Sequence, residues 1–188
     1  MDLIPYLERA QAFAHRTLAG VTPDQLAAPT PCTDWDVRQL LSHIAGGARA
    51  FADAAEGQGE PAGGYEYTVV DIPGAAADYR EAAERMAMAW RQPHNVARTV
   101  AMPFGEVPGS VALNIAFLEA CTHGWDLARA TGQPIDLDEE TAEVALRVAR
   151  VMFARAGRRG ASFQAEQPAP EGAPTMDRLA AYMGRHLG

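Results

Sequence analysis

The sequence is short of cysteine, of residues that favour β-strands, and of long apolar runs. Its two cysteines, Cys32 and Cys121, are too few for a disulfide scaffold and lack the paired spacing of a zinc knuckle. No stretch approaches the roughly 18 uninterrupted apolar residues that a transmembrane helix needs. These absences exclude a disulfide-stapled mini-protein, a cysteine-based zinc module and a membrane-spanning chain, so we expect no membrane partner.

Basic side chains are also in deficit, since 16 Lys and Arg stand against 24 Asp and Glu and give a net charge of −8. Non-specific binding to nucleic acid or to an anionic membrane needs a basic surface that displaces counterions. We therefore expect no nucleic-acid partner. The segment Met1–Tyr6 has no basic stretch followed by an apolar run, so we expect no signal peptide and a cytoplasmic location.

What the sequence does contain is abundant alanine and apolar residues at helical spacing. The periodicity predicts helices over 3–18, 33–56, 75–91, 110–132 and 138–156, and a short one from 175. A chain of 188 residues is long enough for one domain with a proper core and marginal for two. We predict a single all-α domain over 1–188, a four-helix bundle with additional C-terminal helices.

The helix ends and connections carry further predictions. Thr33, followed three residues later by Asp36, resembles a capping box, and Ser110 is a candidate cap for the fourth helix. Thr175 is a candidate cap for the last one. The stretch 57–72 should be a connection, and 100–107 is either a small hairpin or a loop.

Glu119 and His123 are the most informative pair in the sequence, because residues four apart lie one above the other on a helix. At about 100° per residue, Asp126 and several small residues fall on the same side. Ionisable groups turned toward an interior are costly unless a partner or a metal compensates them. The pattern therefore predicts a metal site, although a Glu-x-x-x-His spacing alone recurs by chance on many helices.

His43 is the candidate third ligand, on the flank of the apolar stripe of the second helix beside Gly46 and Gly47. Two imidazoles and a carboxylate suit zinc, iron or nickel, and they leave one coordination position open. Asp126 could orient the His123 ring through its second nitrogen. By contrast, we expect Cys32 to be a buried apolar residue and, as the alternative, a reactive thiol at the start of the second helix. Cys121 is expected in the core. Trp35 and Trp125 are expected to be packing residues, with a place in the lining of a ligand pocket as the alternative.

Three segments, 30–43, 119–132 and 173–185, resemble the DinB/YfiT-like superfamily. They are most similar to the metal-binding N-terminal domain of mycothiol-dependent maleylpyruvate isomerase and to its short actinobacterial relatives. The resemblance implies a four-helix bundle with a divalent metal held by His43, Glu119 and His123. It leaves the identity of the metal open, with zinc expected first and nickel or iron as alternatives.

The same resemblance implies a thiol-dependent transferase, in which the metal activates a small-molecule thiol such as mycothiol for attack on an electrophilic substrate. The related isomerase has a second domain for which 188 residues leave no room, so isomerase activity itself is not expected. Two alternatives stay open at this point. One is a metal- or small-ligand-binding module without turnover, and the other is an iron-dependent oxygenase with a facial triad. A homodimer is also left open.

Overall fold

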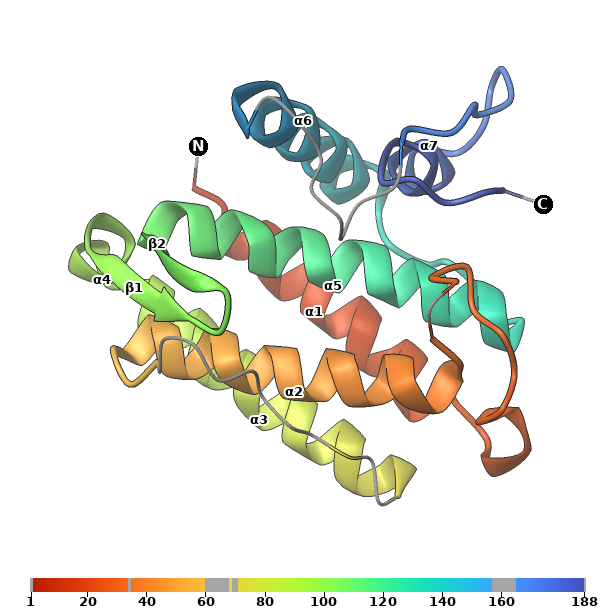
Figure 1. Cartoon of the computed structure of the whole chain (residues 1–188), viewed down its shortest axis with the longest axis horizontal. Helices are drawn as coiled ribbons and strands as arrows, with labels where there is room; N and C mark the ends of the chain where they lie inside the picture. The colour runs from red at the N-terminus through yellow and green to blue at the C-terminus, as the bar shows by residue number, and fades with distance from the viewer. Residues whose placement is uncertain (1, 34, 60–67, 69–70, 157–164, 188) are drawn as a thin grey trace.

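The computed structural model describes residues 2–33, 35–59, 68, 71–156 and 165–187, and helices dominate it (Figure 1). The elements, in chain order, are α1 (Ile4–Ala19), the 3-10 turn η1 (Pro23–Gln25), α2 (Val37–Glu56), α3 (Ile72–Trp90), α4 (Pro93–Ala97), β1 (Thr99–Met102), β2 (Gly105–Pro108), α5 (Gly109–Thr131), α6 (Glu139–Ala156) and α7 (Thr175–Tyr182). The all-α fold class predicted from the sequence is confirmed.

Four of these helices form the bundle. Helix α1 packs on α3 and α5, and α2 packs on the same two helices, so that the four enclose one core. Helices α6 and α7 pack on each other and on α5, outside the bundle, as Figure 1 shows. The prediction of a four-helix bundle with additional C-terminal helices is therefore correct. Among the described residues, no helix combines the length and the apolarity that crossing a bilayer requires.

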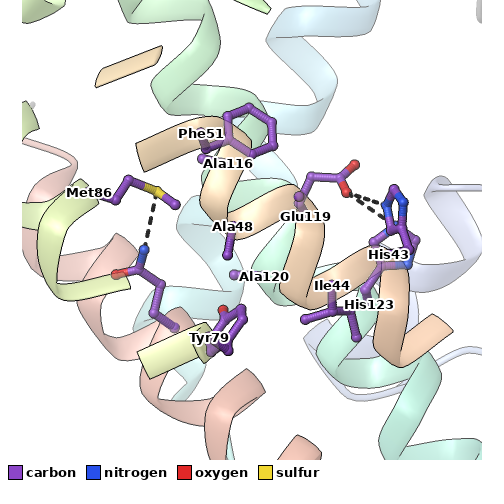
Figure 2. A pocket seen from close by; sticks show the side chains of 12 residues that line it. His43, Ile44, Ala48, Phe51, Tyr79, Met86, Ala116, Glu119, Ala120 and His123 are labelled. Atoms are coloured by element: carbon purple, nitrogen blue, oxygen red, sulfur yellow. Dashed lines mark hydrogen bonds and ion pairs between the residues drawn. The ribbon is translucent and has the colours of Figure 1, made fainter. Parts of the chain in front are cut away.

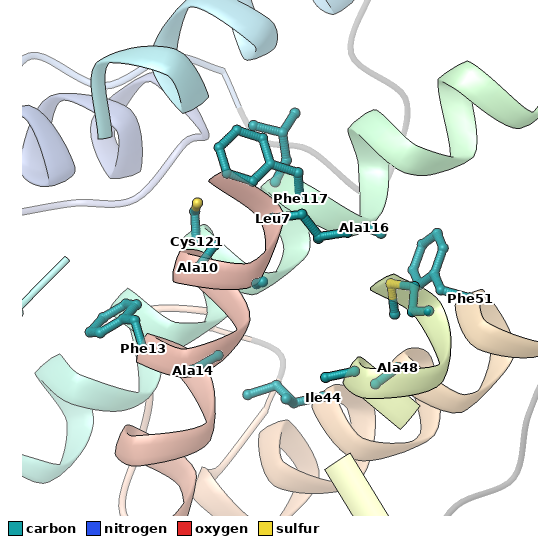
Figure 3. Packing of buried hydrophobic residues seen from close by; sticks show 14 of the residues in the cluster. Leu7, Ala10, Phe13, Ala14, Ile44, Ala48, Phe51, Ala116, Phe117 and Cys121 are labelled. Atoms are coloured by element: carbon teal, nitrogen blue, oxygen red, sulfur yellow. The ribbon is translucent and has the colours of Figure 1, made fainter. Parts of the chain in front are cut away.

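Large and small apolar side chains of α1, α2 and α5 together build the core, and Figure 3 shows Phe51 and Ala48 of α2 among them. Phe13 and Phe117 are fully buried, as is Cys121, whose burial raises the pKa of its thiol. A Cβ added at Gly124 would lie 2.7 Å from Cε1 of Phe13, which shows how closely α1 and α5 approach there. The prediction that Cys121 belongs to the core is confirmed.

Three helix caps that the sequence predicted, Thr33, Ser110 and Thr175, are wrong. Helix α2 is capped by Asp36, whose Oδ1 accepts a hydrogen bond from the Gln39 amide at 2.8 Å. Thr33 lies in a turn before the helix, because the segment that enters α2 is extended and forms a bridge between Pro29 and Asp36. Ser110 does not cap α5, since that helix already begins at Gly109.

The start of α7 is the third such case. Pro174 precedes the helix, and the Thr175 hydroxyl donates instead to the Glu139 carboxylate at the start of α6. Helix α3 begins three residues earlier than predicted, because the Asp71 carboxylate accepts from the Gly74 amide at 2.6 Å and caps it. The hairpin alternative for 100–107 is confirmed as the pair β1 and β2, and the short α4 before it was not predicted. The predicted connection over 57–72 lies largely outside the described residues.

Candidate metal centre

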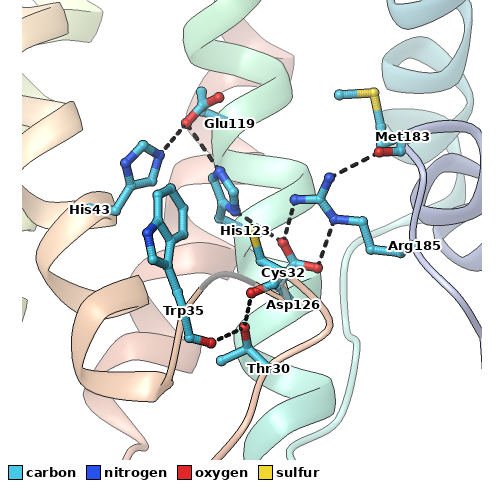
Figure 4. Close-up of polar contacts among 9 residues, drawn as sticks. All are labelled: Thr30, Cys32, Trp35, His43, Glu119, His123, Asp126, Met183 and Arg185. Atoms are coloured by element: carbon cyan, nitrogen blue, oxygen red, sulfur yellow. Dashed lines mark hydrogen bonds and ion pairs between the residues drawn. The ribbon is translucent and has the colours of Figure 1, made fainter. Parts of the chain in front are cut away.

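The three predicted ligands meet where α2 packs against α5 (Figure 4). Nε2 of His43 lies 2.9 Å from Oε2 of Glu119, and Nε2 of His123 lies 3.3 Å from the same oxygen. One donor atom from each of the three residues can be chosen so that all lie within 4.8 Å of one another. The structure therefore brings together residues that are 76 positions apart in the chain.

The separation at His123 matches that of donors that share one ion, and the one at His43 is shorter and is a hydrogen bond in this structure. Donors about 2.0–2.2 Å from a tetrahedral cation lie roughly 3.3–3.6 Å from each other. The distances of 2.9 and 3.3 Å around Glu119 are close to that range. Two imidazoles and one carboxylate are also the donor types that zinc and similar divalent cations accept. The residues present thus fit a divalent metal.

Local sequence explains the convergence on one point. Glu119 and His123 are one turn apart on α5, and their side chains leave the same face. Ala116 and Ala120 on α5 and Ala48 on α2 line the adjoining space, where larger side chains would fill it. Small residues at the contact between the two helices therefore leave room beside the three candidate ligands.

A second layer of polar contacts fixes the orientation of His123. Oδ2 of Asp126 lies 3.0 Å from Nδ1 of His123, as predicted, and the Asp126 side chain is fully buried. Arg185, beyond the end of α7, donates from Nε to Oδ1 of Asp126 at 3.1 Å and from Nη2 to Oδ2 at 2.8 Å. It also donates from Nη1 to the carbonyl of Met183 at 2.9 Å. With Nδ1 directed at Asp126, the Nε2 atom of His123 faces Glu119.

Arg185 was not identified from the sequence, although one signal pointed to it. A buried aspartate needs a cation or several hydrogen-bond donors, and Asp126 was already placed on the inward face. The segment 173–185 also carried part of the family resemblance. Only the packing of the C-terminal segment against α5 shows that Arg185 is the partner.

The charges of the site depend on one another. Burial alone would raise the pKa of Glu119, but the charge of His123 and hydrogen bonds from both histidines hold it well below its usual range. Burial lowers the pKa of His123, yet Glu119 and Asp126 outweigh it and raise the pKa to about 9. For Asp126, hydrogen bonds from His123 and Arg185 overcome burial and lower the pKa. The site thus keeps two carboxylates ionised, Asp126 fully buried and Glu119 half-buried beside the pocket.

The loop before α2 covers the other side of the histidines. The Trp35 ring lies with its centroid 4.3 Å from that of His43 and 5.8 Å from that of His123. The Thr30 hydroxyl bonds the carbonyl oxygens of Cys32 and Trp35 at 2.9 and 2.8 Å and holds this loop together. Trp35 therefore lies beside the candidate ligands, as the less favoured alternative for this residue expected.

Cys32 differs from its prediction as well. It is only partly buried, and its sulfur lies within 4.8 Å of a ring nitrogen of His123 and a carboxylate oxygen of Asp126. The prediction of a buried apolar cysteine is wrong, because residue 32 lies at a bend in the irregular loop before α2, beside His123 and Asp126. Trp125, in contrast, is buried as predicted, and its Nε1 donates to Asp177 of α7 at 2.8 Å.

A pocket opens beside the three candidate ligands (Figure 2). The space at the pocket is about 340 Å³ when the open solvent at its mouth is counted, but the part that a water-sized molecule can reach is only about 20 Å³. In Figure 2, the histidines lie on one side of the view and Met86 on the opposite side, with Phe51, Ala48 and Tyr79 between them. The arrangement has the composition of a small-molecule site, an apolar wall with a few polar groups at one end.

Comparison with known proteins places the chain in a family. The model of the mycothiol maleylpyruvate isomerase N-terminal domain matches residues 7–128. An uncharacterized protein of Mycobacterium tuberculosis, found in two strains, is 37% identical over 186 residues, which are 98% of this chain and 98% of the relative.

Two crystal structures share the fold. One is that of the mycothiol-dependent maleylpyruvate isomerase, at 19% identity, and the other is that of its histidine-to-alanine mutant, at 18%. Each has a TM-score of 0.59 and covers 81% of this chain and 70% of its own. With the family model spanning most of the four-helix bundle and both candidate ligand helices, the chain belongs to the mycothiol maleylpyruvate isomerase N-terminal domain family.

Proposed function

We propose that the protein is a metal-dependent transferase that joins a low-molecular-weight thiol, mycothiol or a similar one, to an electrophilic small molecule. His43, Glu119 and His123 would hold the divalent metal, zinc in the first place and nickel or iron as alternatives. The observation that carries the proposal is the convergence of these three side chains beside an open pocket. Membership of a family named for a mycothiol-dependent enzyme supports the choice of thiol.

When bound, a divalent cation favours the thiolate form of a coordinated thiol over the thiol itself and so supplies a competent nucleophile near neutral pH. The sulfur then forms a bond to an electrophilic carbon. The thiol proton is either lost with a leaving group or ends on the product, so the reaction needs no oxidant or reductant. The chain positions the reactants. A set of two histidines and one glutamate would leave one coordination position of the metal open for the sulfur of the thiol.

Each neighbouring residue has a specific part in this arrangement. Asp126 accepts the Nδ1 proton of His123, which fixes the ring so that Nε2, once it has given up its proton, would bind the metal. Arg185 holds Asp126 ionised and oriented through its two hydrogen bonds. Trp35 packs against the ring of His43 and restricts its rotation. The three ligands are thus held in place by partners from the loop before α2, from α5 and from the C-terminal segment.

The proposal is tested by metal analysis followed by a conjugation assay. The purified protein should bind about one equivalent of zinc, and it should consume mycothiol in the presence of an electrophile such as monobromobimane. Glu119→Ala and His43→Ala should abolish both properties, whereas His94→Ala, which removes an exposed imidazole from α4, should change neither. Full activity without metal, or full metal binding by His43→Ala, would refute the assignment.

A binding module without turnover is the second candidate. It is favoured by one observation: apart from Tyr79, the described residues that line the pocket include no acid or base besides the three candidate ligands. Such a module would bind metal and thiol in a 1:1 complex and release the thiol unchanged. Sustained mycothiol consumption over many turnovers, lost in a folded Glu119→Ala variant, separates the transferase from the module.

A further inference from the structure

The hairpin of β1 and β2 is fixed to both helices that supply the candidate ligands. Arg98, directly before β1, donates from Nη2 to the carbonyl oxygen of Ala55 near the end of α2 at 2.7 Å. After β2 the chain enters α5 at once, and the Gly109 amide donates to the Arg98 carbonyl oxygen at 2.7 Å. A Cβ atom at Gly109 would lie 2.3 Å from the carbonyl oxygen of Asn95, so the backbones are in close contact there. The base of the hairpin therefore has little freedom to move relative to α2 and α5.

The strands of this hairpin pack on the bundle, but the turn between them carries an aromatic ring into the solvent. Val100 and Met102 of β1 are buried, and the hairpin contacts α2 and α5. Phe104, in the turn, is 62% exposed. In the described part of the chain only two other large apolar side chains are exposed, Met88 and Val151. Phe104 is thus an apolar surface group on a rigidly held support.

The pocket beside the candidate ligands extends toward the same end of the bundle. Its lining includes Phe51 of α2 and Ala116 of α5, which Figure 2 shows away from the histidines. At about 1.5 Å per residue, Phe51 and Ala116 lie only about 8–11 Å from the helix ends that the hairpin joins. Figure 1 shows the hairpin across these ends of α2 and α5. Trp35, on the other side of the histidines, does not line the pocket. The pocket side of the candidate metal centre is therefore also the side of the hairpin.

The pocket itself admits very little of a ligand. The space that a water-sized molecule can reach is about 20 Å³, enough for about one water molecule. Under the proposed function, the sulfur of a thiol lies at the metal. The rest of a sugar-based thiol such as mycothiol is far too large for this space, so it has to lie outside, on the surface next to α2 and α5. The C–H face of a sugar ring is apolar and can pack on an aromatic ring while the hydroxyls stay in water.

From these observations we propose that Phe104 belongs to the thiol-binding site and packs on the sugar of a thiol whose sulfur lies at the metal. This inference rests on the proposed transferase function and identifies a binding surface for its thiol. Phe104 brings apolar contact area and no group that can take part in proton transfer. It should therefore affect the binding of the thiol and leave the chemical step unchanged.

The test measures binding of mycothiol to the zinc-loaded protein by titration calorimetry. Phe104→Ala should weaken binding roughly three- to tenfold, the range expected for loss of an aromatic contact. Phe104→Trp, which keeps an aromatic ring, should retain the affinity. Met88→Ala is the matched control, because it removes a side chain from α3 that is 60% exposed, and it should change nothing. Zinc content and helicity show that each variant is folded; unchanged binding in folded Phe104→Ala would overturn the inference.

A second measurement identifies the part of the ligand that Phe104 contacts. N-acetylcysteine carries a thiol without the sugar, so its affinity should be the same for Phe104→Ala and the unsubstituted protein. In the conjugation assay with monobromobimane, Phe104→Ala should raise the KM for mycothiol by the factor found in the titration. The kcat and the KM for monobromobimane should stay unchanged. An equal loss of affinity for N-acetylcysteine, or a rise confined to the KM for monobromobimane, would contradict the assignment of Phe104 to the sugar.

The outcomes separate this inference from the proposed function. If mycothiol binds with the expected dependence on Phe104 but no electrophile is conjugated, the assignment of the binding surface stands and the transferase proposal fails. If conjugation proceeds with the same KM for mycothiol in Phe104→Ala, the transferase proposal stands and the binding surface is wrong. Absence of any mycothiol binding to the zinc-loaded protein would refute both.

Discussion

Arg185 donates two hydrogen bonds to the carboxylate of Asp126, and the same carboxylate is hydrogen-bonded to Nδ1 of His123. Because Arg185 lies 59 positions after Asp126, this contact ties the C-terminal segment to the C-terminal part of α5. Both side chains are buried, so the pair is shielded from the solvent that weakens surface ion pairs. The candidate metal centre is therefore supported by a segment that contributes no ligand to it.

Replacing Arg185 with methionine should destabilise the fold strongly. It leaves Asp126 buried with a single partner, and removal of one member of a buried ion pair costs about 3–5 kcal/mol. Urea unfolding followed by circular dichroism measures the loss. Arg16→Met, which breaks an exposed pair with Asp136, is the matched control and should cost less than about 1 kcal/mol.

The double variant with Asp126→Asn tests the cause of that loss. Once the uncompensated charge is gone, the free energy of unfolding should recover in part relative to Arg185→Met alone. A double variant as unstable as the sum of the two single variants would show that the pair contributes through packing and not through charge.

Asp126→Asn alone should weaken metal binding about 10- to 100-fold, the effect usual for loss of a carboxylate that orients a histidine ligand. The amide keeps the shape of the side chain but no longer favours the Nδ1-protonated ring to the same degree. Competition with a chromophoric zinc chelator measures the affinity. Asp136→Asn, on the surface, should leave it unchanged, and an equal loss in that control would point to a general charge effect.

Trp35 should report metal binding by its fluorescence, because its ring packs directly on that of His43. Titration of zinc into the metal-free protein should change the emission, and Trp35→Phe should remove that change while stoichiometric binding persists. Trp125→Phe should retain the signal, since Trp125 bonds Asp177 on the far side of α5. A signal that survives in Trp35→Phe would contradict the placement of this ring beside the metal.

Asp138 gives a pH-dependent prediction away from the metal. Its carboxylate accepts from the Thr141 amide at 2.9 Å at the start of α6 and from Arg9 at 3.1 Å. These bonds outweigh partial burial and hold its pKa below the ordinary 3.8. A depressed pKa in the folded state means that the stabilisation is complete above about pH 4 and is lost as the pH falls through the folded-state value.

Asp138→Ala should accordingly cost about 0.5–2 kcal/mol at pH 7, the usual effect of removing a helix cap. The difference from the unsubstituted protein should shrink below pH 4 as the native carboxylate becomes protonated. Thermal unfolding at pH 7, 5, 4 and 3 measures it. A difference that stays constant over that range would show that the charged form of Asp138 has no role.

The sequence was most informative where a single helix decides the geometry. The spacing of Glu119 and His123 places both on one face of α5 whatever surrounds it, and the family resemblance supported the choice of His43 as the third candidate ligand. The core position of Cys121 followed from the same helical winding.

Predictions failed for residues whose position depends on packing between segments that are far apart in the sequence. Cys32 lies in an irregular loop, and Arg185 follows the last helix, so neither belongs to a periodic pattern that would indicate its direction. The prediction of Thr33 as the cap of α2 failed for the same reason. Both residue types can cap a helix, and the bridge between Pro29 and Asp36 places Asp36 at the helix start.

The 76-residue separation of His43 and Glu119 also has a kinetic consequence. The pair on α5 alone can offer a cation only two donors, so a complete site exists only after α2 has packed beside α5. A ligand that binds only the assembled state stabilises it by mass action and leaves less ordered states unaffected. Bound metal should therefore slow the unfolding rate of the protein far more than it accelerates refolding.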